Sequence, residues 1–314
     1  MGAHPSKTHT NPGWNKWYKA LLLIIGCVFV SIVCLSSGCS SGKQHDQAHA
    51  QGNVGAGQAI ENKGSDTLVN LALAWAEVYM HQNSEVRISV TGGGSGTGIA
   101  SMINGTVSIA NASREMKKEE IEALKAKGIT PVEFIVARDA IAVVVNKSNP
   151  IEGLTLSQIS DIYTGKITNW SQVGGEDRPI VLLSRESNSG TYVYFLDNVI
   201  RLGRKSDLLF SADTLLMPSS EGISVEVRQN PNAIGYDGLG YVTPDQKVLG
   251  VAKASGSPYV LPSIKTVNDG TYPISRPLYM YTAGQPNGQI KSYLEWVVNG
   301  GQALVSSLGF VPLH

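Results

Sequence analysis

Four short segments of the chain combine hydroxyl, glycine and arginine residues at points where a strand is followed by a helix. They are Gly64-Ser65-Asp66-Thr67, Gly92 to Gly98, Ala112-Ser113-Arg114 and Arg185 to Thr191. Glycine has no Cβ, so backbone N–H groups in such turns can approach a ligand closely. A helix start adds unpaired N–H donors and the positive end of the helix dipole. Together with guanidinium groups, these donors suit a tetrahedral oxyanion.

The elements that position these segments alternate between short strands and helices from Ala59 onward, which predicts an α/β fold. The run Val86 to Val90 alternates like a strand, and Ile99 to Ile103 begins a helix after the glycines. Apolar residues at helical spacing from Leu68 to Tyr79 predict an amphipathic helix, with Ser65 or Asp66 as its cap. In open α/β sheets, ligands bind beyond the carboxyl ends of the strands, so the four segments are expected to converge there.

Two unusually long apolar runs, residues 134–146 and 272–282, are predicted to be strands that cross between two lobes. Asp139 lies in the middle of the first run. Because a buried carboxylate without partners is costly, Asp139 is expected to have a specific hydrogen-bond donor. Thr155-Leu156-Ser157-Gln158 has the form of a capping box and predicts a helix that ends near Gly165.

The length of 314 residues is enough for two ordinary domains, and the formal charge is balanced, with 25 basic and 25 acidic residues. Residues 1–38 contain three lysines and no acid, which leaves 22 basic and 25 acidic residues in 39–314. A nucleic-acid partner would require a basic face, so this balance argues against one.

The N-terminus has the pattern of a targeting segment. Residues 1–19 are polar, Ala20 to Leu35 are almost wholly apolar, and Ser36-Ser37-Gly38-Cys39 follows. This resembles a bacterial lipoprotein signal peptide over 1–38, with Cys39 as the lipidated residue. The alternative is an uncleaved anchor helix, for which the apolar run is short. Residues 39–58 have almost no large apolar side chains and are predicted to form a flexible tether.

Cysteine and histidine usage limits the chemistry of the exported part. The three cysteines are Cys27, Cys34 and Cys39, so no disulfide, thiolate metal site or cysteine nucleophile is expected after them. Of the six histidines, His81 is the one within the predicted globular region. We therefore expect no metal, no cofactor and no catalytic residue.

The segments above, in this order, resemble the PstS family of phosphate-binding lipoproteins of bacterial ABC importers over residues 59–314. The remaining matching stretches are Asp161 to Trp170 and Ala233-Ile234-Gly235-Tyr236. The resemblance implies a two-lobed periplasmic-binding-protein (type II) fold, with two mixed sheets flanked by helices and joined by two crossing strands. Lobe 1 would comprise residues 59–137 plus 273–314, and lobe 2 residues 138–272.

The resemblance also implies a set of phosphate-binding residues. These are Thr67, Leu68, Ser95, Ser113, Arg114, Asp139, Arg185, Ser189, Gly190 and Thr191. Some family members have an acid at the position of Arg114, where it accepts the phosphate proton. In this chain the acceptor must lie elsewhere, with Asp139 the first candidate and Asp66 the second. Arg114 would then donate to a phosphate oxygen or orient that acid.

The implied function is extracytoplasmic binding of inorganic phosphate and its delivery to the permease and ATPase subunits of an ABC importer. The protein would be a lipid-anchored monomer without enzymatic activity. Two alternatives stay open: a binding protein for another oxyanion such as sulfate or molybdate, and a secreted phosphatase. The second is disfavoured because the glycine-rich turn lacks the Gly-Lys-Ser/Thr ending of a P-loop.

Overall fold

The computed structural model describes residues 59–314, which lie in one compact unit, Val54–His314. The predicted signal peptide, the lipidation site Cys39 and the tether lie outside the described residues. Within residues 59–314, none of the helices has the length and apolar character needed to cross a membrane.

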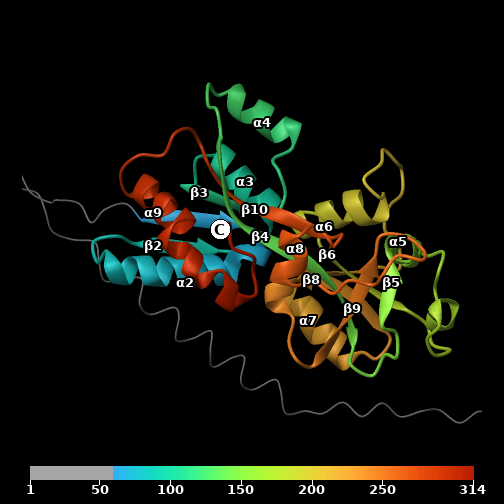
Figure 1. The fold of residues 1–314 in the computed structure, drawn as a ribbon. Helices are drawn as coiled ribbons and strands as arrows, with labels where there is room; N and C mark the ends of the chain where they lie inside the picture. The colour runs from blue at the N-terminus through green and yellow to red at the C-terminus, as the bar shows by residue number, and fades with distance from the viewer. Residues whose placement is uncertain (1–58) are drawn as a thin grey trace, which may run out of the picture. The chain divides into compact units, whose positions relative to one another are not determined.

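A mixed sheet runs through the described part in the order β2-β1-β3-β10-β4-β8-β6-β7 (Figure 1). The strands of its first part are β1 (Ile60–Gly64), β2 (Ile88–Thr91), β3 (Ile109–Ala112) and β10 (Ser275–Thr282). Strands β1, β2 and β3 are parallel, and β10 runs antiparallel to β3. The flanking helices are α2 (Asp66–Gln82), α3 (Ser95–Ile103), α4 (Lys118–Lys125) and α9 (Gly288–Val298). Helices α2 and α9 pack on one face of these strands, and α3 and α4 on the other.

The long strand β4 (Val132–Asn146) continues from the first part of the sheet into the second. Its residues up to Ala140 pair with β10, and from Ile141 onward it pairs with β8 (Ala233–Gly238) and β9 (Gln246–Ala252). The chain returns through β10, preceded by Tyr272, whose hydroxyl donates to the Ile141 carbonyl at 2.6 Å. Strand β4 therefore crosses as predicted, whereas β10 begins three residues later than expected and pairs only within the first part of the sheet.

The second part of the sheet is completed by β6 (Val181–Arg185), β7 (Leu215–Met217) and β5 (Gly153–Thr155). Its helical segments are α5 (Leu156–Tyr163), α6 (Gly190–Phe195), η2 (Leu196–Ile200), α7 (Ser220–Gln229) and α8 (Ile264–Asn268), with shorter turns at η1 (Trp170–Val173), η3 (Leu239–Tyr241), η4 (Gly300–Leu304) and η5 (Ser306–Leu308). Helix α7 covers one face, and α5 and η2 cover the other. The capping box at Thr155 is present, as predicted.

Each part of the sheet has its own aromatic core. In the first, Trp75 is fully buried and donates to the Gly301 carbonyl at 2.8 Å, as expected for the apolar face of the helix predicted from Leu68 to Tyr79. In the second, the rings of Phe195 and Tyr236 stack with centroids 3.6 Å apart. Ser65 is the N-cap residue of α2, one of the two predicted, but its side chain makes no capping hydrogen bond. The Asp66 carboxylate does not cap the helix because it bonds to Gly93 and Arg185.

Gly98 lets α3 lie directly against β1. A Cβ at this position would overlap the Lys63 carbonyl oxygen and lie 2.6 Å from Gly64 Cα. We expect Gly98→Ala to destabilise the protein by about 1–3 kcal/mol, because backbone must move to admit the methyl group. Thermal unfolding measures this, with Gly222→Ala in α7 as the control, since a Cβ there meets atoms no closer than 3.5 Å. Equal melting temperatures for the two variants would contradict the prediction.

Candidate functional site

The four strand-to-helix segments meet in one place, where their hydroxyl groups are buried. The hydroxyls of Thr67 and Thr191 are 2.9 Å apart, and Ser95 Oγ lies 3.3 Å from Ser113 Oγ and accepts from the Ser113 N–H at 3.0 Å. Gly190 packs against both serines, and a Cβ there would lie 2.5 Å from Ser113 Oγ and overlap that of Ser95. Glycine at position 190 is thus required for this approach, and the expected convergence of the segments is confirmed.

Arg276 of β10, which was not among the residues predicted from the sequence, lies at the centre of this hydroxyl cluster. Its Nη2 donates to Thr191 Oγ1 at 2.9 Å and to Asp139 Oδ2 at 3.0 Å, and lies 3.4 Å from Thr67 Oγ1. Its Nη1 donates to the Ser113 carbonyl at 3.0 Å. Because a guanidinium group only donates, the threonine oxygens accept from it and their hydrogens point elsewhere. One of the two threonine hydroxyls donates its hydrogen to the other. The hydrogen of the second hydroxyl is then available to a ligand.

A signal for Arg276 was present in the sequence, as a lone arginine within the second long apolar run. The register of the sheet places Arg276 directly opposite Asp139. Asp139 is fully buried, and its Oδ1 has no hydrogen-bond partner within residues 59–314. Burial raises the pKa of Asp139, while Arg276 and the backbone N–H of Leu239 oppose that rise. The prediction that Asp139 has a specific donor is confirmed.

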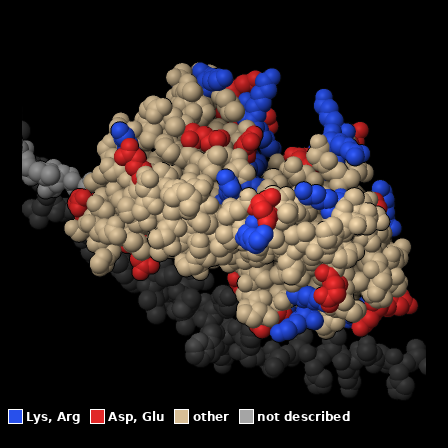
Figure 2. All heavy atoms as spheres, viewed as in Figure 1, with Lys and Arg blue, Asp and Glu red and all other residues tan. Residues whose placement is uncertain are grey.

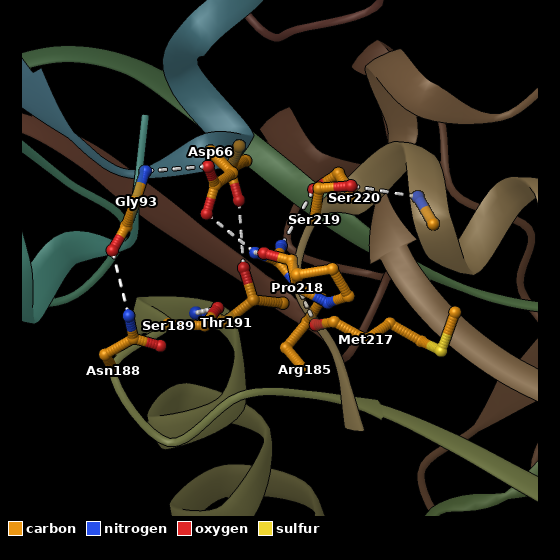
Figure 3. A network of polar contacts seen from close by, with 12 residues as sticks. Asp66, Gly93, Arg185, Asn188, Ser189, Thr191, Met217, Pro218, Ser219 and Ser220 are labelled. Carbon is orange, nitrogen blue, oxygen red and sulfur yellow. Dashed lines mark hydrogen bonds and ion pairs between the residues drawn. The ribbon is translucent and has the colours of Figure 1, made fainter. Parts of the chain in front are cut away.

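Arg185, at the end of β6, is 1% exposed and gives most of its N–H groups to the protein (Figure 3). Its Nη2 donates to Asp66 Oδ2 at 2.7 Å and to the Pro218 carbonyl at 3.0 Å. Its Nη1 donates to Ser220 Oγ at 3.0 Å, and its Nε to the Met217 carbonyl at 3.3 Å. Arg185 therefore links the start of α2 to the start of α7, and one N–H on Nη1 is not used by these contacts.

Two contacts attach the glycine-rich turn to its neighbours. The Gly93 N–H donates to Asp66 Oδ1 at 2.9 Å (Figure 3), and the Gly96 N–H donates to the Asn188 carbonyl at 2.9 Å. The Asn188 side chain donates in return to the Gly93 carbonyl at 2.9 Å. Asn188 was not among the predicted site residues, although it lies within the segment Arg185 to Thr191.

Three of the predicted site residues have partners that were not expected from the sequence. Arg114 makes a two-bond ion pair with Glu120, at 2.7 and 2.8 Å, so its charge is matched locally. Leu68 is buried in the core, and its N–H donates to the Ser65 carbonyl at 3.0 Å. The Ser189 hydroxyl accepts from the N–H groups of Thr191 and Tyr192 and so caps α6. Each of them supports the shape of its turn.

Asp237 of β8 is a second buried acid near the cluster, also missed from the sequence. Its Oδ1 accepts from the Gly238 N–H at 2.8 Å, and its Oδ2 has no partner among the described residues. The pKa of Asp237 is raised to about 7, chiefly by burial and to a smaller extent by the charge of Asp139, whereas Arg185, Ser220 and the Gly238 N–H oppose this rise. Asp237 directly follows the matching stretch Ala233-Ile234-Gly235-Tyr236, and this position is the signal in the sequence that could have marked it as a site residue.

A cavity of about 560 Å³ reaches the cluster at Arg276. It is also lined by Arg114, Lys117, Tyr194 and Tyr279, among others. The Arg276 guanidinium carbon lies 5.5 Å from the centre of the Tyr194 ring, within the range of a cation–π contact. On the face drawn in Figure 2, basic and acidic side chains are interspersed, and no uniform basic surface appears there.

Comparisons with known proteins agree on one family. A PBP superfamily domain model matches residues 43–300. The phosphate-binding protein PstS of Pseudomonas aeruginosa is 34% identical over 272 residues, covering 81% of this chain and 83% of its own. PstS of Bacillus subtilis is 30% identical over 297 residues, covering 94% of each chain. A substrate-binding protein from Clostridium perfringens, determined with bound phosphate, has a TM-score of 0.73 and 32% identity, covering 82% of this chain and 100% of its own.

The raised pKa of Asp237 predicts a pH-dependent stability. Between about pH 4 and pH 7 the unfolded chain has lost this proton and the folded chain holds it, so stability falls as the pH rises through this window. The folded protein would lose on the order of 4 kcal/mol of stability across this window, since a tenfold change in proton affinity corresponds to about 1.36 kcal/mol. We expect Asp237→Asn to gain stability over the wild type between pH 5 and pH 8, measured by thermal unfolding. The exposed Asp207→Asn is the control. A stability difference between Asp237→Asn and the wild type that does not change with pH would contradict the prediction.

Proposed function

Because the chain belongs to the PstS family of the PBP superfamily, we propose that it binds inorganic phosphate outside the cytoplasm and delivers it to an ABC importer. The observation that carries this proposal is the buried cluster of Thr67, Ser95, Ser113 and Thr191 around Arg276. Hydroxyls, backbone N–H groups and guanidinium charge together form the donor set that a phosphate requires. The relatives named phosphate-binding protein and the phosphate-bound structural neighbour support the choice of anion.

We place the ligand where the turn before α3 meets the turn after β6. Ser95 and Ser113 would contribute hydroxyls from one side, and Thr67 and Thr191 from the other. The remaining predicted ligands, Leu68, Arg114, Arg185, Ser189 and Gly190, surround this point, and Arg276 is added to them. Since Arg185 and Arg114 already make bonds within the protein, Arg185 would act chiefly through its charge and Arg114 chiefly through the shape of its turn.

The division into a lobe of residues 59–137 plus 273–314 and a lobe of 138–272 is part of this proposal. Separate cores support it, since Trp75 and Phe195 belong to different hydrophobic clusters. Direct contacts between the two parts include, at the site, the ion pair of Asp66 with Arg185 and the hydrogen bond of Thr67 with Thr191. The Tyr194 hydroxyl also donates to the Ser275 carbonyl across this boundary. Phosphate bound at this point would add further bonds across the boundary and favour the closed arrangement.

Asp139 is the acceptor that we assign to the phosphate proton. Monohydrogen phosphate and sulfate have the same charge and shape, but phosphate carries a hydrogen that it can donate. Asp139 has a free, buried Oδ1, whereas both oxygens of Asp66 are engaged by Arg185 and Gly93. A carboxylate here accepts from phosphate and repels sulfate. This favours phosphate over the sulfate and molybdate alternatives.

Calorimetric titration of phosphate, sulfate and molybdate into the purified protein tests this assignment. Asp139→Asn keeps the shape but can turn an amide donor toward the anion. We expect it to weaken phosphate binding on the order of 10- to 100-fold, the scale of a charged hydrogen bond, and to narrow the gap between phosphate and sulfate. Asp213→Asn, which is exposed, should behave like the wild type. An unchanged phosphate-to-sulfate ratio would remove Asp139 from this role and direct the same test to Asp66.

We propose binding without catalysis, since the hydroxyl cluster has neither a cysteine nor a histidine beside it in the described residues. A chromogenic phosphate ester should therefore yield no product above the buffer rate. Sustained turnover that is lost in Thr67→Ala or Ser113→Ala would support the phosphatase alternative instead.

The proposed partners are the permease and ATPase subunits of the importer, and the proposed anchor is a lipid on Cys39. If that lipid holds the protein on the membrane, Cys39→Ser should move it from the membrane fraction to the soluble fraction with phosphate affinity unchanged. Cell fractionation followed by titration measures both properties. Retention of the variant in the membrane fraction would show that the apolar run of residues 20–35 is the anchor.

A further inference from the structure

The proposed phosphate site has more acidic than basic groups, which disfavours the binding of an anion. Three carboxyl groups, on Asp66, Asp139 and Asp237, surround the cluster, against two guanidinium groups, on Arg185 and Arg276. The nearby Arg114–Glu120 pair adds no net charge, since its two members neutralise each other. With all groups ionised, the site has a formal surplus of one negative charge before any ligand arrives.

A dianion would increase this surplus to three negative charges in a poorly solvated region. Like charges interact far more strongly there than in water, because the effective dielectric constant is lower. Backbone N–H groups and hydroxyls offset part of this repulsion, but they carry no net charge. Uptake of one proton by a site carboxylate would remove one of the three negative charges.

Of the three carboxyl groups, Asp237 is the one suited to take the proton. Asp66 and Asp139 each form an ion pair, at 2.7 Å with Arg185 and 3.0 Å with Arg276. Asp237 is 1% exposed and forms no ion pair within 4.0 Å among the described residues. Its Oδ1 accepts one backbone hydrogen bond, and its Oδ2 accepts none from the described residues. Protonation of Oδ2 would therefore leave the hydrogen bond from the Gly238 N–H to Oδ1 in place.

The groups that face Asp237 come from four neighbouring elements. Arg185 of β6 favours its ionised form, whereas Asp139 of β4 disfavours it, and Ser220 of α7 lies within reach as an uncharged hydroxyl. Burial raises the pKa of the Tyr241 hydroxyl of η3 and the charge of Asp237 adds to that rise; this hydroxyl donates to the Asp66 carbonyl at 2.5 Å. The pKa of Asp237 near 7 means that a modest change in local charge shifts its proton occupancy at physiological pH.

We infer that phosphate binding is coupled to the uptake of one proton by Asp237, which offsets part of the charge of the bound dianion. The inference rests on the proposed function. The proton comes from solvent and stays on Oδ2 while the anion is bound, and both are released together. Phosphate still donates its own hydrogen to Asp139. Affinity for the dianion therefore falls as the pH rises above about 7, where the free protein has lost the Asp237 proton.

Proton uptake can be counted by titrating inorganic phosphate into the full protein at about pH 8.5 in two buffers of different ionisation enthalpy. The difference in heat gives the protons taken up per phosphate bound. We expect close to one for the wild type, close to one for the exposed Asp207→Asn, and close to none for Asp237→Asn. The affinity of Asp237→Asn should also change less between pH 7 and about pH 9 than that of the wild type.

Equal proton uptake by the wild type and Asp237→Asn would overturn the inference, as would phosphate binding by the wild type without uptake. No phosphate binding by the wild type would instead overturn the proposed function, so the two failures are distinguishable. If Asp237→Asn does not fold, Asp237→Ser takes its place in the same titration. Infrared difference spectra of the wild type provide a second measurement, because phosphate should produce a new protonated-carboxyl band at about pH 8.5. Absence of this band would also overturn the inference.

Discussion

The buried ion pair between Asp139 and Arg276 is the contact on which the site depends. The two residues face each other on β4 and β10, and both are almost fully shielded from water. Removing two charges from water costs several kcal/mol per ion, which their attraction offsets only with further hydrogen bonds. Arg276 makes those bonds to the Ser113 carbonyl and the Thr191 hydroxyl. The ion pair therefore fixes the strands and the hydroxyl cluster in the same geometry.

The second constraint is the close approach of backbone segments, which glycine makes possible. Gly190 sits against two serine hydroxyls, and Gly94 lies so near Asn188 that a Cβ would be 2.8 Å from its carbonyl oxygen. Gly94 also has a φ of 89°, a conformation that other residues rarely adopt. The glycines thus allow the turn to lie in direct contact with the segment around Asn188. The buried arginines contribute positive charge to the same region.

Much of this arrangement could be predicted from the sequence, because it follows from local patterns. The strand, turn and helix order around Gly92 to Gly98, the capping box at Thr155 and the need of Asp139 for a donor are properties of short segments. The partners themselves could not be predicted. Asp139 and Arg276 are 137 positions apart, and Asp66 and Arg185 are 119 apart, so their pairing depends on strand order and register. Arg114 was assigned to the ligand from the resemblance, and its ion pair with Glu120 could not be predicted because it depends on the turn before α4.

Both buried arginines are paired with carboxylates, and this pairing separates two properties of a binding site, its affinity for an anion and its choice among anions. Because Arg185 gives most of its N–H groups to protein oxygens, and Arg276 gives several of its own, they act on an anion mainly through charge, and their positions are fixed before it binds. The hydroxyls and backbone N–H groups are left to make the direct bonds. In the proposed site, affinity would depend on the balance between guanidinium and carboxyl charges, whereas the choice among anions would depend on the acceptor at Asp139. Under this proposal, protonation of one acid would change the affinity of the site without changing which anion it prefers.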